Sequence, residues 1–77
     1  MGSWIVPGTN IRVQVRSDDV RHAPHAHVYS GGETASVALN GAKLAGGLKG
    51  KSLALAVAWI IKNKRMLEEE WEKYNHV

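Results

Sequence analysis

Three of the chain's four histidines are His22, His25 and His27, and Tyr29 follows shortly after them. The imidazole of histidine titrates near neutral pH, so it can accept a proton from a hydroxyl group or donate one to a leaving oxygen. Neutral imidazole is also a common ligand of zinc, copper and nickel. Alternate residues of a β-strand point to the same side of a sheet. The spacing of His25, His27 and Tyr29 therefore fits either proton transfer or metal binding at one surface.

Proton transfer would suit a phosphodiester substrate. His27 would act as the general base or acid, an arginine would stabilise the phosphate charge, and Tyr29 would stack on a base. A metal-independent ribonuclease needs such a set of groups, and the same set would also bind nucleic acid without cleaving it. The predicted catalytic residues are His25, His27 and Tyr29, and the predicted nucleic-acid contacts are Arg12, Arg16 and Lys43.

Metal binding is the second interpretation, with His22, His25 and His27 as the ligands. A closed structural zinc site takes four ligands, and the spacing fixes no carboxylate beside these histidines. We therefore expect no cofactor unless the three imidazoles hold a transition metal. In a third interpretation the histidines only shape the strand and its loop, where Pro24 restrains the backbone.

Strands must position these residues, because apolar and polar types alternate along the first part of the chain. Ile11, Val13 and Val15 would point to one face, and the residues between them to the other. The alternation and its turn signals predict strands at about residues 4–6, 11–16, 25–30, 33–39 and 42–45.

Two glycine-containing turns predict hairpins between the last three of these strands. Gly31-Gly32 would place Val28 opposite Ala35 and His27 opposite Ser36. Asn40-Gly41, as a two-residue turn, would place Val37 opposite Leu44 and Leu39 opposite Ala42. Both registers sort Ala35, Val37 and Leu39 to one face, so we expect an antiparallel meander with one apolar face.

A helical pattern follows over about residues 53–74, with Ser52 as the predicted N-cap. Asn63 interrupts the pattern, so we expect a kink there. The apolar stripe of the helix consists of Leu53, Ala56, Val57, Ile60, Leu67, Trp71 and Tyr74. The predicted fold is α+β, a meander of three to five strands with a C-terminal helix or kinked helix pair packed on one face.

The face of the sheet that the helix leaves uncovered would be polar. It would carry histidine, tyrosine, serine and arginine with no carboxylate except Glu33 at a turn. One face of an antiparallel sheet is commonly solvated, so the kinds of polar residue are the informative feature. The residues expected on this face are Arg12, Gln14, Arg16, His25, His27, Tyr29, Thr34, Ser36 and Lys43.

The chain has 77 residues, enough for one domain spanning residues 1–77 and too few for two. A chain this short buries little apolar surface, and a homodimer is one way to bury more. The sequence has no cysteine and no apolar stretch of the roughly 20 residues that span a bilayer, and we expect no signal peptide. We therefore expect a soluble cytoplasmic protein that does not enter membranes.

The net charge of +3 is unevenly distributed. No acidic residue occurs among residues 34–67, whereas four glutamates fall within residues 68–72. A basic central region would attract phosphates or an acidic partner, although charges of this kind also simply keep a protein soluble.

At residues 24–28 the sequence Pro-His-Ala-His-Val resembles a family of small bacterial proteins catalogued as a domain of unknown function, whose members carry a Pro-Pro-His-x-His-Val motif. Ala23 stands in place of the first proline. The resemblance continues at residues 32–35, Gly-Glu-Thr-Ala, and at residues 71–72, Trp-Glu. It implies a short single domain, often encoded beside a second small protein, as in toxin–antitoxin modules.

From the residues and this resemblance we expect a module that binds or cleaves RNA through its histidine-bearing face. Its expected partners are RNA and a cognate small protein from a neighbouring gene. The alternative is a protein-interaction or metal-binding domain without enzymatic activity, which would itself form a homodimer or act as an antitoxin-like partner.

Overall fold

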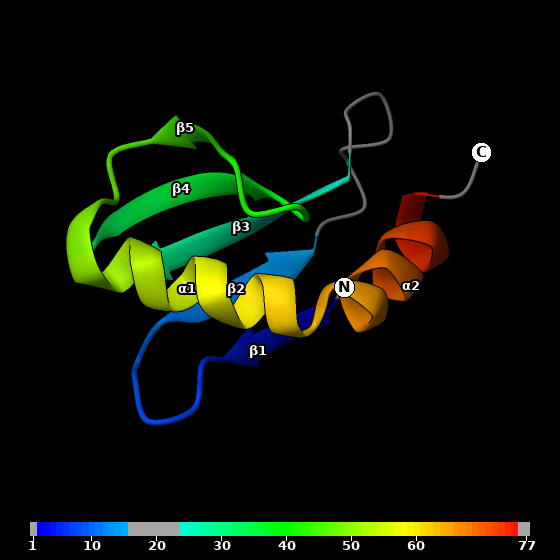
Figure 1. Ribbon diagram of the computed structural model, residues 1–77, viewed down its shortest axis with the longest axis horizontal. Coiled ribbons are helices and arrows are strands. Elements are labelled where there is room, and N and C mark those ends of the chain that lie inside the picture. The colour runs from blue at the N-terminus through cyan, green and yellow to red at the C-terminus, as the bar shows by residue number, and fades with distance from the viewer. Residues whose placement is uncertain (1, 16–23, 76–77) are drawn as a thin grey trace.

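The computed structural model describes residues 2–15 and 24–75, and these form a five-stranded antiparallel sheet followed by two helices (Figure 1). The strands pair in chain order, from β1 at one edge to β5 at the other. The predicted α+β meander with a helix pair is therefore confirmed. The elements are β1 (Gly2–Ile5), β2 (Arg12–Val15), β3 (His25–Ser30), β4 (Glu33–Ala38), β5 (Lys43–Gly46), α1 (Gly50–Lys62) and α2 (Lys64–Asn75).

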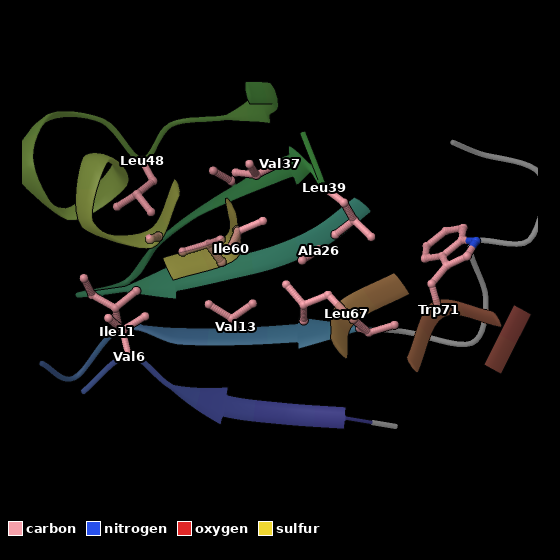
Figure 2. Close-up of a cluster of buried hydrophobic side chains, with 14 residues drawn as sticks. Val6, Ile11, Val13, Ala26, Val37, Leu39, Leu48, Ile60, Leu67 and Trp71 are labelled. Carbon is pink, nitrogen blue, oxygen red and sulfur yellow. The ribbon is translucent and has the colours of Figure 1, made fainter. Parts of the chain in front are cut away.

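The core lies between one face of the sheet and the two helices. Figure 1 shows both helices on the same side of the sheet, with α1 across the strands and α2 near the start of β3. Valines from neighbouring strands meet Ile60 of α1 and Leu67 of α2, and all of these side chains are fully buried (Figure 2). Alternation along β2, β3 and β4 therefore commits one face to the helices, and neither described helix packs over the other face.

The hairpin between β3 and β4 has the predicted register. His27 pairs with Ser36, and Val28 pairs with Ala35. Gly31 and Gly32 both have positive φ, as a two-residue hairpin turn of this type requires. Glycine adopts such angles without steric cost, so the sequence specifies this turn locally.

The hairpin between β4 and β5 differs from the prediction, because its loop contains three residues. The Gly41 N–H donates to the Ala38 carbonyl at 2.8 Å, and the Ala38 N–H donates to the Ala42 carbonyl at 2.8 Å. Gly41 has φ of +98°, but Asn40 does not have positive φ, because only glycines do among the described residues. Asn40 instead accepts a bond from the Ala42 N–H at 3.0 Å through its side-chain oxygen. Only one residue thus takes the special conformation, and the loop widens to residues 39–41.

This wider loop shifts the register of β5. Val37 pairs with Lys43, not with Leu44 as predicted, whereas Ser36 pairs with Ala45, in the register that the predicted turn implies. Leu44 is the extra residue of a β-bulge between these two pairs, and its side chain is exposed. The predicted pairings of Val37 and Leu39 across this hairpin were therefore wrong, although both residues are buried in the core as expected.

Helix α1 begins at Gly50, three residues before the predicted start at residue 53. Its N-cap is Lys49, whose side chain makes no capping bond, so the prediction of Ser52 as N-cap was wrong. The adjacent Leu48 explains the early start, because its side chain is buried and its N–H donates to the Thr34 carbonyl at 2.9 Å. These two contacts fix where the chain leaves the sheet.

The predicted interruption at Asn63 is confirmed, since α1 ends at Lys62 and α2 begins at Lys64. The backbone N–H and the side-chain amide of Asn63 both donate to the Trp59 carbonyl, at 3.0 and 2.9 Å. These two hydrogen bonds to one carbonyl end α1, and α2 begins directly after Asn63. No helix in the described part of the chain is long and apolar enough to cross a membrane.

Candidate functional site

The candidate site is the face of the sheet turned away from the helices, which we call the open face. His27 lies at its centre, where it pairs with Gln14 of β2 and with Ser36 of β4. All three side chains are half-buried. The paired residues of neighbouring strands point to the same side of a sheet, so these three form one row across β2, β3 and β4.

A second row lies next to it. Tyr29 pairs with Arg12 on one side and with Thr34 on the other. Arg12 and Thr34 are exposed, and Tyr29 is half-buried. The open face therefore presents a cation, an aromatic ring and a hydroxyl group side by side, one strand spacing apart.

One hydrogen bond joins the two rows. The Tyr29 hydroxyl donates to the Gln14 side-chain oxygen at 3.2 Å. Gln14 is the partner of His27, so the bond runs diagonally from the Tyr29 row to the His27 row. It restrains the ring of Tyr29 beside the imidazole and orients the Gln14 amide.

His25 follows the alternation of β3 but does not share the exposure of the open face. Only 5% of its surface is accessible. Its ring lies against Trp71 of α2, with centroids 5.2 Å apart, and meets the ring of His27 edge-on at 5.1 Å. The expectation that both imidazoles emerge on the open face therefore holds for His27 only. The cause is α2, which carries Trp71 to the end of the sheet where β3 begins (Figure 2).

The structure separates Lys43 from the other predicted nucleic-acid contacts. Lys43 is exposed, but the shifted register pairs it with Val37, whose side chain belongs to the core. Arg12 thus remains as the cation beside Tyr29. Arg16 and His22 lie outside the described residues.

The metal interpretation names His22, His25 and His27. Within residues 2–15 and 24–75, no three histidine, aspartate or glutamate side chains come together as ligands for a metal ion. The two described imidazoles contact each other, and His25 is covered by an indole. That environment resembles a packed aromatic cluster more than an open coordination site.

Two partners in the site were not assigned from the sequence. Trp71 was predicted as part of the apolar stripe, and it is buried as expected, but its contact with His25 was not foreseen. Gln14 was placed on the open face without its bond to Tyr29. The bond between Gln14 and Tyr29 could have been predicted from the register of β2 against β3, which places these two residues diagonally across from each other.

The family model described as Domain of unknown function (DUF4160) matches residues 10–72. This span includes all of β2 to β5, all of α1 and most of α2. Neither a curated protein nor a solved structure matches the chain.

Proposed function

The chain belongs to the family described as Domain of unknown function (DUF4160), and we propose that it binds RNA on the open face of its sheet. The observation that carries this proposal is the cross-strand pairing. It brings Arg12, Tyr29 and His27 together on β2 and β3, on the face opposite the two described helices. A sheet with exposed aromatic and basic side chains is a common platform for single-stranded nucleic acid.

Each group has a role that its chemistry supports. The exposed guanidinium of Arg12 would bind a backbone phosphate through paired N–H groups. The ring of Tyr29 would stack on a base, a contact typically worth about 1–3 kcal/mol. Thr34 and Ser36 would offer hydroxyl groups to base edges or to ribose. Stacking needs unpaired bases, so the proposed ligand is single-stranded RNA.

Cleavage of the bound strand is the second candidate function, and the accessible position of His27 favours it. The imidazole of His27 would take the proton of a ribose 2′-hydroxyl, and the resulting oxygen would attack the adjacent phosphorus. The bond from phosphorus to the 5′-oxygen would break, leaving a 2′,3′-cyclic phosphate and a 5′-hydroxyl group that takes its proton from water. Arg12 would stabilise the charge on phosphate. His25 would be a positioning residue, because it contacts the ring of His27 from a buried place.

The cellular setting is part of the proposal. We infer a cytoplasmic two-component module of the toxin–antitoxin kind, in which a cognate small protein from a neighbouring gene is the partner. The support is the genomic arrangement that the resemblance at residues 24–28 implies. A non-enzymatic interaction domain is the alternative, and it predicts no loss of RNA binding when the open face is altered.

The experiment is an anisotropy titration of a fluorescent single-stranded oligoribonucleotide with the full chain at several salt concentrations. Arg12→Ala should weaken binding. It should also reduce the slope of the logarithm of the binding constant against the logarithm of the salt concentration by about one, because it removes one phosphate contact. Lys49→Ala is the matched control, since Lys49 is an exposed cation at the start of α1. Equal effects of the two variants, or no binding by the unaltered chain at low salt, would refute the proposal.

A further inference from the structure

Helix α1 is apolar on the side that faces away from the sheet as well as on the side that faces it. Ala56 and Ile60 are fully buried against the core. Leu55 and Ile61 lie outside it, with 39% and 53% of their surfaces exposed, and Ala58 between them is exposed too. Ile61 forms the edge of this side, because part of its side chain lies beside Gly41 of the β4–β5 loop. A helix that covers one face of a sheet normally carries polar residues on its outer side. The outer side of α1 therefore has the composition of a surface that another chain covers.

Helix α2 provides an internal comparison, because it lies on the same side of the sheet (Figure 1). Its exposed residues are charged, among them Lys64, Arg65, Glu68 and Glu69. The Arg65 guanidinium lies 4.0 Å from the Glu69 carboxylate, one turn away. Since α2 has the ordinary polar exterior, the apolar exterior of α1 is specific to that helix.

Cations flank the apolar surface at both ends. Lys51 lies in the first turn of α1 and Lys62 is its last residue, and both are exposed. Helix α1 contains no acidic residue. We call Lys51, Ala54, Leu55, Ala58, Ile61 and Lys62 the outer face of α1.

A hollow extends this face at the break between the helices. It is open to solvent, has a volume of about 330 Å³, and is lined by Lys62, Asn63, Arg65, Met66 and Glu69. The side-chain N–H of Asn63 donates to the Trp59 carbonyl, so Asn63 lines the hollow with its amide already hydrogen-bonded inside the protein. The hollow thus continues the outer face with the apolar side chain of Met66, and its charged lining is Lys62 together with the paired Arg65 and Glu69.

The charge pattern argues against a second copy of this chain as the occupant. In an antiparallel pairing of two α1 helices, Lys51 of one copy would approach Lys62 and Arg65 of the other. In a parallel pairing, each lysine would approach its own counterpart. Both arrangements place like charges together at the ends of the apolar contact, which is unfavourable.

We propose that the outer face of α1 and the adjoining hollow bind an amphipathic helix of a partner protein, with apolar residues along one side and carboxylates at its flanks. Its apolar side would cover Leu55, Ala58 and Ile61, as in other helix-in-groove complexes. Its carboxylates would meet Lys51 and Lys62. An anionic membrane is the less suitable occupant, because an interfacial helix buries a broader apolar face with aromatic anchors. This inference does not depend on RNA binding.

The test uses the full chain and two synthetic helical peptides that share one leucine face. The first peptide carries glutamates at its flanks, and the second carries lysines at the same positions. Calorimetric titration should show that the glutamate peptide binds at least about tenfold more tightly than the lysine peptide, a difference of about 1.4 kcal/mol. Replacing the two lysines that flank the outer face of α1, with Lys51→Glu and Lys62→Glu, should reverse this preference.

Ile61→Glu should weaken binding of the glutamate peptide about tenfold or more. Ile5→Glu is its matched control, because Ile5 is the same residue type with 52% exposure but pairs with Arg12 on the open face. Ala58→Glu serves as a second variant if Ile61→Glu melts at a lower temperature. Equal binding of the two peptides, or equal effects of Ile61→Glu and Ile5→Glu, would overturn the proposal.

Two other outcomes would assign the face to a different occupant and also overturn it. Sedimentation that shows a dimer dissociated by Ile61→Glu would assign it to a second copy. Binding to phosphatidylglycerol vesicles that Ile61→Glu abolishes, without binding of the glutamate peptide, would assign it to a membrane. RNA binding at the open face should be unchanged by Ile61→Glu, so failure of either proposal can be recognised separately.

Discussion

The imidazole ring of His25 lies against the indole ring of Trp71, with centroids 5.2 Å apart and ring planes tilted by 51°. This contact joins the first residue of β3 to α2, and both side chains are buried. His25 also meets the ring of His27, which is half-buried on the open face. The chain of three rings therefore connects the docking of α2 to the centre of the candidate site.

The contact between His25 and Trp71 should be measurable as a coupling energy. In a double-mutant cycle with His25→Ala and Trp71→Leu, we expect a coupling of about 1 kcal/mol in the free energy of unfolding, the range for aromatic pairs. The cycle of Thr34→Ala with Trp71→Leu is the control, because Thr34 is exposed and pairs with Tyr29, and this cycle should be additive within about 0.5 kcal/mol. Urea denaturation monitored by circular dichroism gives these values. Additivity in the first cycle would show that the ring contact is not energetically significant.

The two parts of Tyr29 should contribute differently to RNA binding. Tyr29→Ala removes the ring and should weaken binding about 5- to 150-fold, which corresponds to the loss of about 1–3 kcal/mol of stacking. Tyr29→Phe removes only the hydroxyl that donates to Gln14 and should weaken binding less than about fivefold. Anisotropy titration with the same oligoribonucleotide compares them. If Tyr29→Phe weakens binding as much as Tyr29→Ala does, the hydroxyl group and not the ring contacts the RNA.

His27→Ala should separate cleavage from folding. We expect loss of any 2′,3′-cyclic phosphate product, detected by mass spectrometry of the digested oligoribonucleotide, with a change in melting temperature of only a few degrees. His27→Gln is the useful companion, because it keeps polarity and approximate size without the proton-transfer group. If stability and cleavage fall together in both variants, His27 has a structural role only.

Gly46 and Gly47 offer a matched test of the β4–β5 pairing. Gly46 has φ of +107°, and a Cβ there would collide with the Thr34 carbonyl oxygen and lie 2.6 Å from Ala35 Cα. Gly46→Ala should therefore destabilise the fold by about 3 kcal/mol. A Cβ on Gly47 would meet nothing closer than 3.9 Å, so Gly47→Ala should change stability by less than about 0.5 kcal/mol. Similar melting temperatures for both variants would contradict the close approach of β5 to β4.

Sequence patterns predicted the parts of the fold that short-range chemistry determines. Gly31 and Gly32 together permit one tight turn, and the alternation on each side fixes its register. Asn40-Gly41 was less informative, because asparagine tolerates positive φ without requiring it. In this loop only Gly41 takes positive φ, and the resulting three-residue loop moves Lys43 away from the predicted surface.

The exposure of His25 was beyond sequence reasoning for a different reason. Alternation assigned it correctly to the side of His27, but its burial depends on how far α2 extends past the sheet. The course of α2 follows from two points on the chain, the end of α1 at Asn63 and its early start after Leu48. Both are consequences of tertiary contacts, which no local pattern records.

The pairing of each strand with its neighbour in the chain bears on how the protein folds. Every hairpin closes over a short segment, so the sheet can assemble step by step without a long search, and topologies of this kind fold quickly for β-rich proteins. The packing of α2 against β2 joins segments that are far apart in the chain, so we expect it to come late. An intermediate that has the sheet but lacks this final step would leave the ring of His25 uncovered.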